Sequence, residues 1–237
     1  MANATTGRWA GQRERRRAEF IDAALVVIEQ HGPQTSTEQI AAHVGVSRTK
    51  LYRHFVDAAD LQREVAQRAS LMITAELAPV WQPEGSMAQI VTAGVSAHVH
   101  FLTQHPNLYR YLQRCSIDEG FSAFADIKIT IANLLCNVLE VYVNAFGVAA
   151  DAERLSYGIV GLVETAAGHW LEQPDRRGQD ALITDLARWI WLMLDDALRA
   201  GGVYLDADEI LPPAPEIAAE RERYRDPARL LRTRIQL

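Results

Sequence analysis

The chain has 237 residues, of which 49% are hydrophobic and 23% charged, and this balance is ordinary for a globular protein with a sizeable core. No run of about 18 uninterrupted apolar residues occurs, so no membrane span is predicted. The N-terminal residues lack the apolar segment of a secretory signal, and we expect a cytoplasmic location. The net charge is −6, yet residues 1–56 carry +3 and the remainder −9. A basic end on an acidic body suggests that one surface faces phosphate.

Two cysteines, Cys115 and Cys136, lie far apart and form neither a CxxC nor a zinc-type spacing. We interpret them as buried small hydrophobic residues. Among the seven histidines, His98 and His100 are two residues apart, so on a helix they point to different faces. The sequence therefore predicts neither a metal site nor a cofactor.

Helical periodicity runs through almost the whole chain, and strand signals are weak, so the pattern predicts an all-α fold. Gly and Pro clusters separate the segments, among them Gly32-Pro33 and a loop over Pro79–Gly85. The expected helices cover residues 13–30, 37–44, 48–55, 58–77, 86–104, 106–112, 121–146, 151–171 and 179–199.

The segment after Gly202 is longer than this helix pattern requires. We expect a tail with one or two short helices, which is disordered, packs on the body or reaches across a dimer. Our hypothesis is that Leu230, Leu231 and Ile235 dock on the body. The segment contains four prolines, at positions 212, 213, 215 and 227.

The segment Ser36–Phe55, STEQIAAHVGVSRTKLYRHF, carries the functional signal. A capped helix is followed by Gly45, which supplies the positive-φ turn of a tight helix–helix corner. Ser47 then caps the next helix, and Leu51 with Phe55 anchors that helix to the core.

The outward face of this second helix is basic, aromatic and rich in hydrogen-bonding groups. Such a face is expected of a helix that lies in the major groove of DNA. Taken alone, however, the same residues would also suit an ordinary solvent-exposed polar face. The succession of cap, small residue, glycine turn and second cap favours DNA binding. The outward residues are Arg48, Thr49, Lys50, Tyr52, Arg53 and His54.

This region resembles the DNA-binding domain of the tetracycline-repressor (TetR/AcrR) family over about Arg13 to Leu77. The residues that carry the resemblance are Ala23-Ala24, Gly32, Ile40-Ala41, Gly45-Val46-Ser47, Leu51-Tyr52 and His54-Phe55. The start of a later helix, His105-Pro106-Asn107-Leu108-Tyr109, is a weaker match.

The resemblance implies an all-helical homodimer that usually represses transcription, and in which a small molecule bound to the C-terminal body shifts the DNA-reading heads. It implies phosphate contacts from Thr37 and Tyr52. It places Arg48, Thr49, Lys50, Arg53 and His54 toward the groove, behind the Ser47 cap. Family members commonly have a phosphate-binding Lys where this chain has Ala58, so one backbone contact is missing.

The N-terminal arginines, Arg8, Arg13, Arg15, Arg16 and Arg17, form either a solvated leader or an arm that neutralises phosphate or enters a minor groove. We select Arg13 and Arg16 as DNA contacts. Such an arm adds salt dependence more than sequence choice.

Six consecutive apolar residues, Trp189–Leu194, lie inside one expected helix and cover all of its sides. One side can face the core, so the other needs a cover, and a second subunit is the simplest one. A four-helix interface with the preceding helix follows. The expected interface residues are Val160, Val163, Trp189, Leu192 and Met193.

Aromatic residues in the body suggest a mostly apolar pocket for a lipophilic, aromatic or acyl effector, although aromatic residues at helical spacing are more often core. The expected lining residues are Phe101, Tyr109, Phe124 and Tyr142. An enzyme is not expected, because the chain has no Gly-rich phosphate loop and no HExxH. Gly94–His98 also has His where the GxSxG nucleophile elbow needs Gly.

The sequence thus predicts a ligand-responsive, sequence-specific DNA-binding regulator that acts as a repressor on a palindromic operator. A DNA-binding regulator without a ligand and a ligand-responsive activator remain alternatives. The expected domains are a basic flexible arm (1–12), a three-helix helix-turn-helix domain (13–57), a helical ligand-binding and dimerisation domain (58–202) and a C-terminal tail (203–237).

Overall fold

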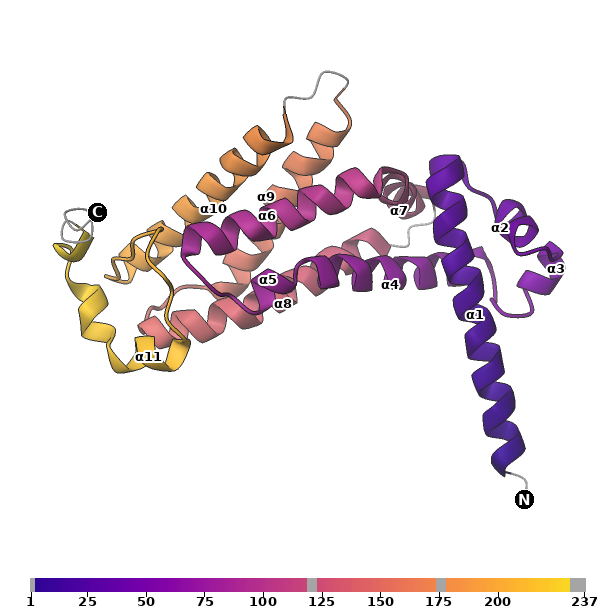
Figure 1. The fold of residues 1–237 in the computed structure, drawn as a ribbon, viewed down its shortest axis with the longest axis horizontal. Helices are drawn as coiled ribbons and strands as arrows, with labels where there is room; N and C mark the ends of the chain where they lie inside the picture. Colours follow the sequence, from indigo (N-terminus) through magenta and orange to yellow (C-terminus); the bar gives the residue numbers. More distant parts are fainter. Residues whose placement is uncertain (1–2, 119–122, 174–177, 231–237) are drawn as a thin grey trace. The chain divides into compact units, whose positions relative to one another are not determined.

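The computed structural model describes residues 3–118, 123–173 and 178–230, and most of them are helical (Figure 1). These residues form no β-strand, and one isolated antiparallel bridge joins Ser86 to Ile210. The all-α prediction is therefore confirmed. In chain order the elements are α1 (Asn3–His31), η1 (Gly32–Gln34), α2 (Thr37–His43), α3 (Arg48–Leu51), α4 (Ala58–Glu76), α5 (Ala78–Trp81), α6 (Met87–Gln104), α7 (Pro106–Asp118), α8 (Ala123–Phe146), α9 (Ala152–Leu171), α10 (Gln179–Ala200), α11 (Ala214–Ala219) and η2 (Arg221–Arg225).

The chain forms two compact units. The first, which we call the head, comprises residues 1–72 and 104–127, and the second, the body, comprises residues 73–103 and 128–237. The head therefore holds α1, α2, α3, α7 and most of α4. The body holds α5, α9, α10, most of α6 and α8, and the C-terminal segment.

The core of the head is an apolar stripe along α1 against which the two short helices pack. Phe20, Val27 and Ile28 are almost fully buried and recur at helical spacing. Leu51 and Phe55, four residues apart, are buried as the sequence predicted. The rings of Phe20 and Phe55 meet edge to face with centroids 6.1 Å apart.

Helix α7 is joined to the C-terminal end of α1 by polar contacts. His105 Nδ1 lies 3.1 Å from Glu29 Oε1, and the Asn107 side-chain amide donates to the Glu29 carbonyl at 2.8 Å. Arg114 donates to the Pro33 carbonyl at 3.4 Å. These contacts satisfy carbonyl groups that the end of a helix leaves without partners.

The turn between α2 and α3 forms as the residues require. Ser36 and Gln39 form a reciprocal capping box at the start of α2. Gly45 has a φ of +72°, a conformation that side chains strain to adopt. The Ser47 hydroxyl then accepts the Lys50 backbone N–H at 3.3 Å and caps α3.

In the body, the long helices α6, α8, α9 and α10 each bury one face. Residues at helical spacing on α9 and α10, such as Ile159, Leu186 and Ile190, are buried. Helix α6 begins at a second capping box, in which Ser86 and Gln89 bind each other's backbone N–H groups at 3.2 and 2.9 Å.

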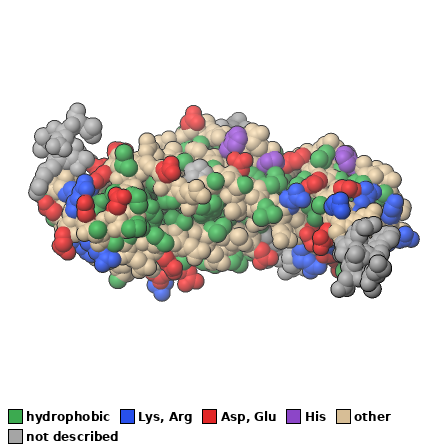
Figure 2. Space-filling view, turned by 60° about the horizontal axis from the view of Figure 1, so that its bottom comes forward, with side chains coloured by type: hydrophobic (Ala, Val, Ile, Leu, Met, Phe, Trp, Pro, Cys, Tyr) green, Lys and Arg blue, Asp and Glu red, His purple; other side chains and the backbone are tan. Residues whose placement is uncertain are grey.

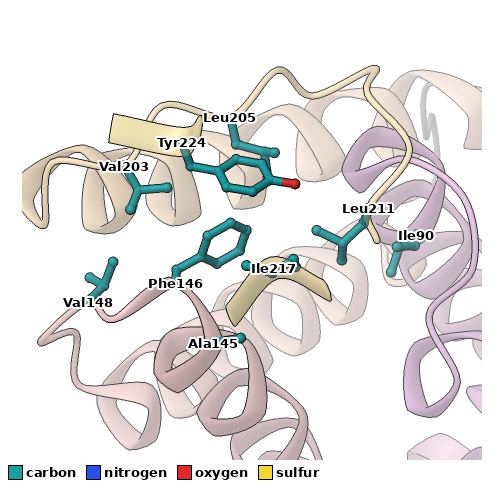
Figure 3. Close-up of a cluster of buried hydrophobic side chains, with 9 residues drawn as sticks. All are labelled: Ile90, Ala145, Phe146, Val148, Val203, Leu205, Leu211, Ile217 and Tyr224. Atoms are coloured by element: carbon teal, nitrogen blue, oxygen red, sulfur yellow. The ribbon is translucent and has the colours of Figure 1, made fainter. Parts of the chain in front are cut away.

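The C-terminal segment, residues 203–230, packs on the body. Its apolar side chains close a buried cluster with the ends of α6 and α8 (Figure 3). Tyr224 is 1% exposed and meets Phe146 edge to face, with ring centroids 5.1 Å apart. Leu230 is partly buried, while Leu231 and Ile235 lie outside the described residues. The cluster consists of Ile90, Ala145, Phe146, Val148, Val203, Leu205, Leu211, Ile217 and Tyr224.

Three arginines of this segment bind backbone carbonyls. Arg221 donates to the carbonyls of Ala145 and Asn144, each at 2.7 Å, and so caps the end of α8. Arg225 donates to Gly201 at the end of α10 and to Phe146 and Gly147 at 3.2 and 3.1 Å. Arg229 donates to the Tyr204 carbonyl at 3.0 Å, pairs with Glu209 and lies over the Tyr224 ring. Cationic side chains are favourable at helix C-termini, where carbonyl groups lack partners.

Several element boundaries differ from the sequence prediction. Helix α1 begins at Asn3 rather than Arg13, so the backbone that we expected as a flexible arm is helical. The reason is local, because this stretch contains no proline to stop the helix. Helix α7 runs to Asp118 rather than Leu112, since the good helix formers Gln113 and Arg114 follow.

Two further differences concern α3 and the predicted loop at Pro79–Gly85. Helix α3 ends at Leu51, and the backbone N–H groups of Arg53 and His54 bind carbonyls three residues back, as in the His54 to Leu51 bond of 2.9 Å. The loop contains the short helix α5, because proline is tolerated in a first turn. Cys115 is buried as expected, but Cys136 is partly exposed, and the two residues do not form a disulfide.

Candidate nucleic-acid interface

The exposed face of α3 and the turn after it carries most of the predicted groove residues. Ser47, Thr49, Lys50 and Arg53 are exposed, and the side chains of Thr49, Lys50 and Arg53 have no hydrogen-bond or ion-pair partner among the described residues. Their donors are therefore available to an external partner. Unpaired basic and hydroxyl groups on a short helix are the groups that read base edges and bind phosphate.

Arg48, the first residue of α3, is held by two neighbours. Its Nη1 donates to Glu38 Oε1 on α2, and its guanidinium carbon lies 5.3 Å from the centroid of the Tyr52 ring. The pKa of Arg48 is raised by hydrogen bonding to Tyr52 and by the charge of Glu38. The sequence analysis did not single out Glu38.

The two predicted phosphate contacts, Thr37 and Tyr52, lie together. The Tyr52 hydroxyl donates to Thr37 Oγ1 at 3.3 Å, and both residues are partly buried. Both hydroxyl protons are engaged within the head, because Tyr52 donates to Thr37 and Thr37 donates to Glu38, so binding a phosphate oxygen requires one of these hydrogen bonds to be exchanged.

Arg17 has a structural role, although the sequence analysis grouped it with the other N-terminal arginines. It binds Glu64 at 2.6 Å and Asp60 at 3.4 Å, donates to the His54 carbonyl and lies 4.6 Å from the Phe55 ring centroid. Burial alone would lower the pKa of Arg17, but the hydrogen bonds to Glu64 and Asp60 outweigh it and raise the pKa. Arg17 is at helical spacing from Phe20 and Ala24, which places it on the buried stripe of α1. This spacing could have revealed the structural role of Arg17 from the sequence.

His54 is partly buried in the head, with one edge of its ring turned inward. Its ring is 5.4 Å from the Phe20 ring, and its Nδ1 atom is enclosed without a partner among the described residues. Burial, and then the charges of Arg13 and other nearby cations, lower the pKa of His54. The neutral form therefore predominates near pH 7, so His54 adds no positive charge to this surface.

Arg13 and Arg16, the two N-terminal arginines that we selected as DNA contacts, differ in their surroundings. Arg13 is exposed, with no partner among the described side chains. Arg16 pairs with Glu19 and lies 5.2 Å from the Phe20 ring centroid. Arg13 is thus the more available of the two for phosphate.

The start of α4 is acidic where the family commonly has Lys. Ala58 is partly buried, the Asp57 side chain accepts the Asp60 backbone N–H at 2.7 Å, and Asp60 accepts the Val56 N–H at 2.9 Å. On the face drawn in Figure 2, blue side chains of the head lie beside red ones. The head therefore carries basic and acidic side chains close together on this face.

The expected effector-binding residues belong to different parts of the structure. In the head, the rings of Tyr109 and Phe124 meet edge to face with centroids 5.4 Å apart, and the Tyr109 hydroxyl accepts from Gln113 at 2.7 Å. In the body, Phe101 is buried, and Tyr142 packs against the cluster that the C-terminal segment closes.

The expected dimer residues divide into exposed and buried ones. Trp189 and Leu192 on α10 are 38% and 53% exposed, which is unusual for large apolar side chains. Val160 and Met193 are partly buried, and Val163 is buried within the chain. On the exposed face of α9, Tyr157 is 42% exposed.

Within the described part of the chain, one helix, Phe124–Phe146, is long and apolar enough to cross a membrane, judged by length and composition alone, and 17% of it is buried. Lys128 on this helix pairs with Glu164 on α9 at 3.6 Å.

Comparison with known proteins identifies the family. Residues 20–65 match the model of the bacterial regulatory proteins of the tetR family. An HTH-type transcriptional regulator from Mycobacterium tuberculosis is 29% identical over 214 residues, which cover 90% of this chain and 91% of the relative. A shorter match to an HTH-type regulator from Haemophilus influenzae is 27% identical and covers 44% of this chain and 52% of that protein.

Solved structures share the fold. The crystal structure of a tetR-family transcriptional regulator from Streptomyces coelicolor matches with a TM-score of 0.63 and 18% identity, and the match covers 94% of this chain and 96% of that one. A tetR-family regulator from Pectobacterium atrosepticum matches with a TM-score of 0.63 and 20% identity over 79% and 96% of the two chains. These relatives are transcriptional regulators rather than enzymes. Residues 20–65 therefore carry a helix-turn-helix of the tetR family of bacterial regulatory proteins, and the matches over most of the chain support a tetR-family transcriptional regulator.

Proposed function

We propose that this regulator reads a specific DNA operator with α3 in the major groove and that a small molecule releases it. The observation that carries the proposal is the row of exposed, unpaired donors on α3 and the turn after it, Thr49, Lys50 and Arg53. Thr37 and Tyr52 flank this row and supply hydroxyl groups for the backbone phosphate. Ser47 fixes the start of α3, and Arg13 adds a sequence-independent contact.

We further propose a cytoplasmic homodimer formed through α9 and α10. The exposed Trp189 and Leu192 support it, since a second copy would remove them from water. Gly161 on α9 has nothing within 4 Å of the place where a Cβ would lie, so another helix could approach closely there. A two-fold dimer would bind a palindrome whose half-sites are about 34–36 Å apart, or a multiple of that spacing.

The proposed effector is lipophilic or aromatic, and the regulator acts as a repressor. The weak burial of α8, the most apolar helix, leaves apolar surface for a ligand of this kind. Of the expected lining residues, Phe101 and Tyr142 lie in the body and are our candidates there.

Selection of binding sites from a pool of random-sequence DNA duplexes tests operator reading. Wild-type protein should enrich a palindromic site, and Arg53→Ala or Tyr52→Ala should bind the selected duplex more weakly while keeping the dimer, as measured by sedimentation. Retained affinity in both variants would refute the assignment of α3 to the groove, and failure of the wild type to enrich any site would refute operator reading itself.

The dimer and the effector have separate tests. Leu192→Asp should convert the dimer to a monomer in sedimentation and abolish binding to the full palindrome, whereas Leu71→Asp, at a comparably exposed leucine on α4, should not. A panel of fatty acids and aromatic compounds should contain at least one member that releases the selected duplex. If none does, the regulator works without such a ligand.

A further inference from the structure

We propose that Glu38 determines sequence specificity by acting through Arg48: it holds the Arg48 guanidinium so that this group reads a base edge. Glu38 is thus a positioning residue on α2 for a contact made by α3. The inference rests on the proposed function, namely DNA reading by α3.

The geometry fixes Arg48 on two sides. One edge of its guanidinium binds the Glu38 carboxylate, and one face lies over Tyr52, one helical turn further on. The side chains of Arg48 and Glu38 are nevertheless 56% and 54% exposed. The guanidinium is therefore oriented and still open to an external partner. Since a guanidinium carries five N–H donors, binding Glu38 leaves others for a base.

Glu38 is itself held in place. Its Oε2 accepts a hydrogen bond from Thr37 Oγ1 at 3.3 Å, and Thr37 Oγ1 accepts one from the Tyr52 hydroxyl at 3.3 Å. Glu38, Arg48, Tyr52 and Thr37 therefore form a closed ring of contacts between the start of α2 and α3. The hydrogen bond from its own backbone N–H, followed by the charge of Arg48, lowers the pKa of Glu38, so the carboxylate is ionised at neutral pH.

Stability and general DNA affinity do not account for this arrangement. Exposed ion pairs contribute little to folding. A carboxylate on a surface that approaches phosphate weakens sequence-independent binding. The remaining consequence of the Glu38 contact is the orientation of Arg48.

Orientation matters because a free arginine on this surface would reach the nearest phosphate. Phosphate contacts carry no sequence information directly, whereas a guanidinium held toward the groove can bind guanine O6 and N7. Lys50 and Arg53 have no comparable side-chain partner among the described residues. The effect of Glu38 should therefore be confined to the base pair that Arg48 reads in each half-site.

The test measures discrimination, the ratio of Kd on a scrambled duplex to Kd on the duplex that wild-type protein selects from a random pool. Glu38→Asp keeps the charge but is one methylene too short to hold Arg48. It should lower discrimination about tenfold, within the range of a single lost base contact. Arg48→Ala should lower it at least as much, and Glu38→Asp should add nothing in an Arg48→Ala background. Glu19→Asp is the matched control, because it shortens the acid of another exposed arginine pair in the head, Arg16–Glu19.

Two further readouts separate positioning from a structural effect. Thermal unfolding of Glu38→Asp should match the wild type, and site selection repeated with this variant should lose preference at one base pair per half-site. Wild-type-like discrimination by Glu38→Asp, an equal loss of affinity for both duplexes, or a full effect without Arg48 would each overturn the inference. If wild-type protein itself bound both duplexes equally, the proposed operator reading would fail. That failure can be told apart from failure of the Glu38 inference, because it is seen with wild-type protein before any variant is measured.

Discussion

The α2–α3 pair and the C-terminal segment, residues 203–230, are both rich in arginine or lysine, but they use these side chains in opposite ways. In the C-terminal segment, Arg221, Arg225 and Arg229 donate to backbone carbonyls of α8, of the end of α10 and of Tyr204. On α3 and the turn after it, Lys50 and Arg53 have no side-chain partner among the described residues. Basic composition alone therefore does not identify a DNA-binding surface, and we take the basic side chains without partners as its candidates.

The same contrast occurs within the head. Arg17 is partly buried and joins α1 to α4 through Asp60 and Glu64. Arg48 is more exposed and has one acidic neighbour, Glu38. We therefore expect substitutions of Arg17 to affect folding and substitutions of Arg48 to affect DNA binding.

The largest expected effect is that of truncation after Gly202. It removes Val203, Leu205 and Tyr224 from the buried cluster and leaves the ends of α8 and α10 uncapped, so the body should lose on the order of 5 kcal/mol or more. Thermal unfolding followed by circular dichroism measures this loss. The matched control is Ile210→Ala within the same segment, because Ile210 is 72% exposed and should contribute little. Unchanged melting and dimerisation after truncation would show that the segment is dispensable.

Arg17→Met should have the second largest effect on stability. It leaves Asp60 and Glu64 without their common partner, and we expect a loss of about 2 kcal/mol in the free energy of unfolding. Urea unfolding measures it. Arg16→Met, which breaks only the exposed pair with Glu19, should change the free energy by less than about 0.5 kcal/mol. Equal losses in the free energy of unfolding for the two substitutions would contradict the distinction between an arginine that joins two helices and an arginine in an exposed ion pair.

The pH dependence of stability provides a third prediction, at His98 on α6. The residue is partly exposed, but its Nε2 atom is enclosed without a hydrogen-bond partner among the described residues, and burial lowers its pKa to about 4. Below pH 6.5 the unfolded chain binds a proton here that the folded chain does not bind until about pH 4. Stability should therefore fall as the pH drops through this window.

His98→Leu should remove this contribution, which is on the order of 1–2 kcal/mol at pH 5. The measurement is the difference in free energy of unfolding between pH 7 and pH 5, compared between variant and wild type so that other titrating groups cancel. Parallel pH profiles would mean that His98 is protonated equally in both states.

The smallest expected effect on stability is that of Arg53→Ala. Its exposed side chain has no side-chain partner among the described residues, so the free energy of unfolding should change by less than about 0.5 kcal/mol. Binding to the selected duplex should nevertheless weaken clearly. A large loss of stability would show that Arg53 has a structural role like that of Arg17, which the exposed α3 residues do not have.

Much of the head could be predicted from the sequence, because its signals are local. The cap at Ser47, the turn at Gly45 and the anchors Leu51 and Phe55 depend on neighbouring residues, and all four take the expected conformations or positions. The family resemblance followed from the same region, and the all-α fold from the helical periodicity of almost the whole chain.

The remaining features depend on contacts between residues far apart in the chain. The ties from Arg17 to Asp60 and from Arg221 to the end of α8 cross more than forty positions, and no periodicity reveals them. The pairing of Glu38 with Arg48 crosses only the turn, but it depends on the angle between two helices. The inward orientation of His54 likewise depends on where Phe20 lies. Tertiary geometry decides these contacts.

The most direct test of the central claim, that the unpaired donors of α3 read DNA sequence, is fluorescence anisotropy on two labelled duplexes across a salt series. One duplex carries the DNA that flanks the protein's own gene or the site selected from a random pool, and the other is a scrambled sequence of the same composition. We predict tight binding to the first duplex that weakens steeply with salt, and binding to the scrambled duplex that is about a thousandfold weaker or more. Equal and weak binding to both duplexes would contradict the claim.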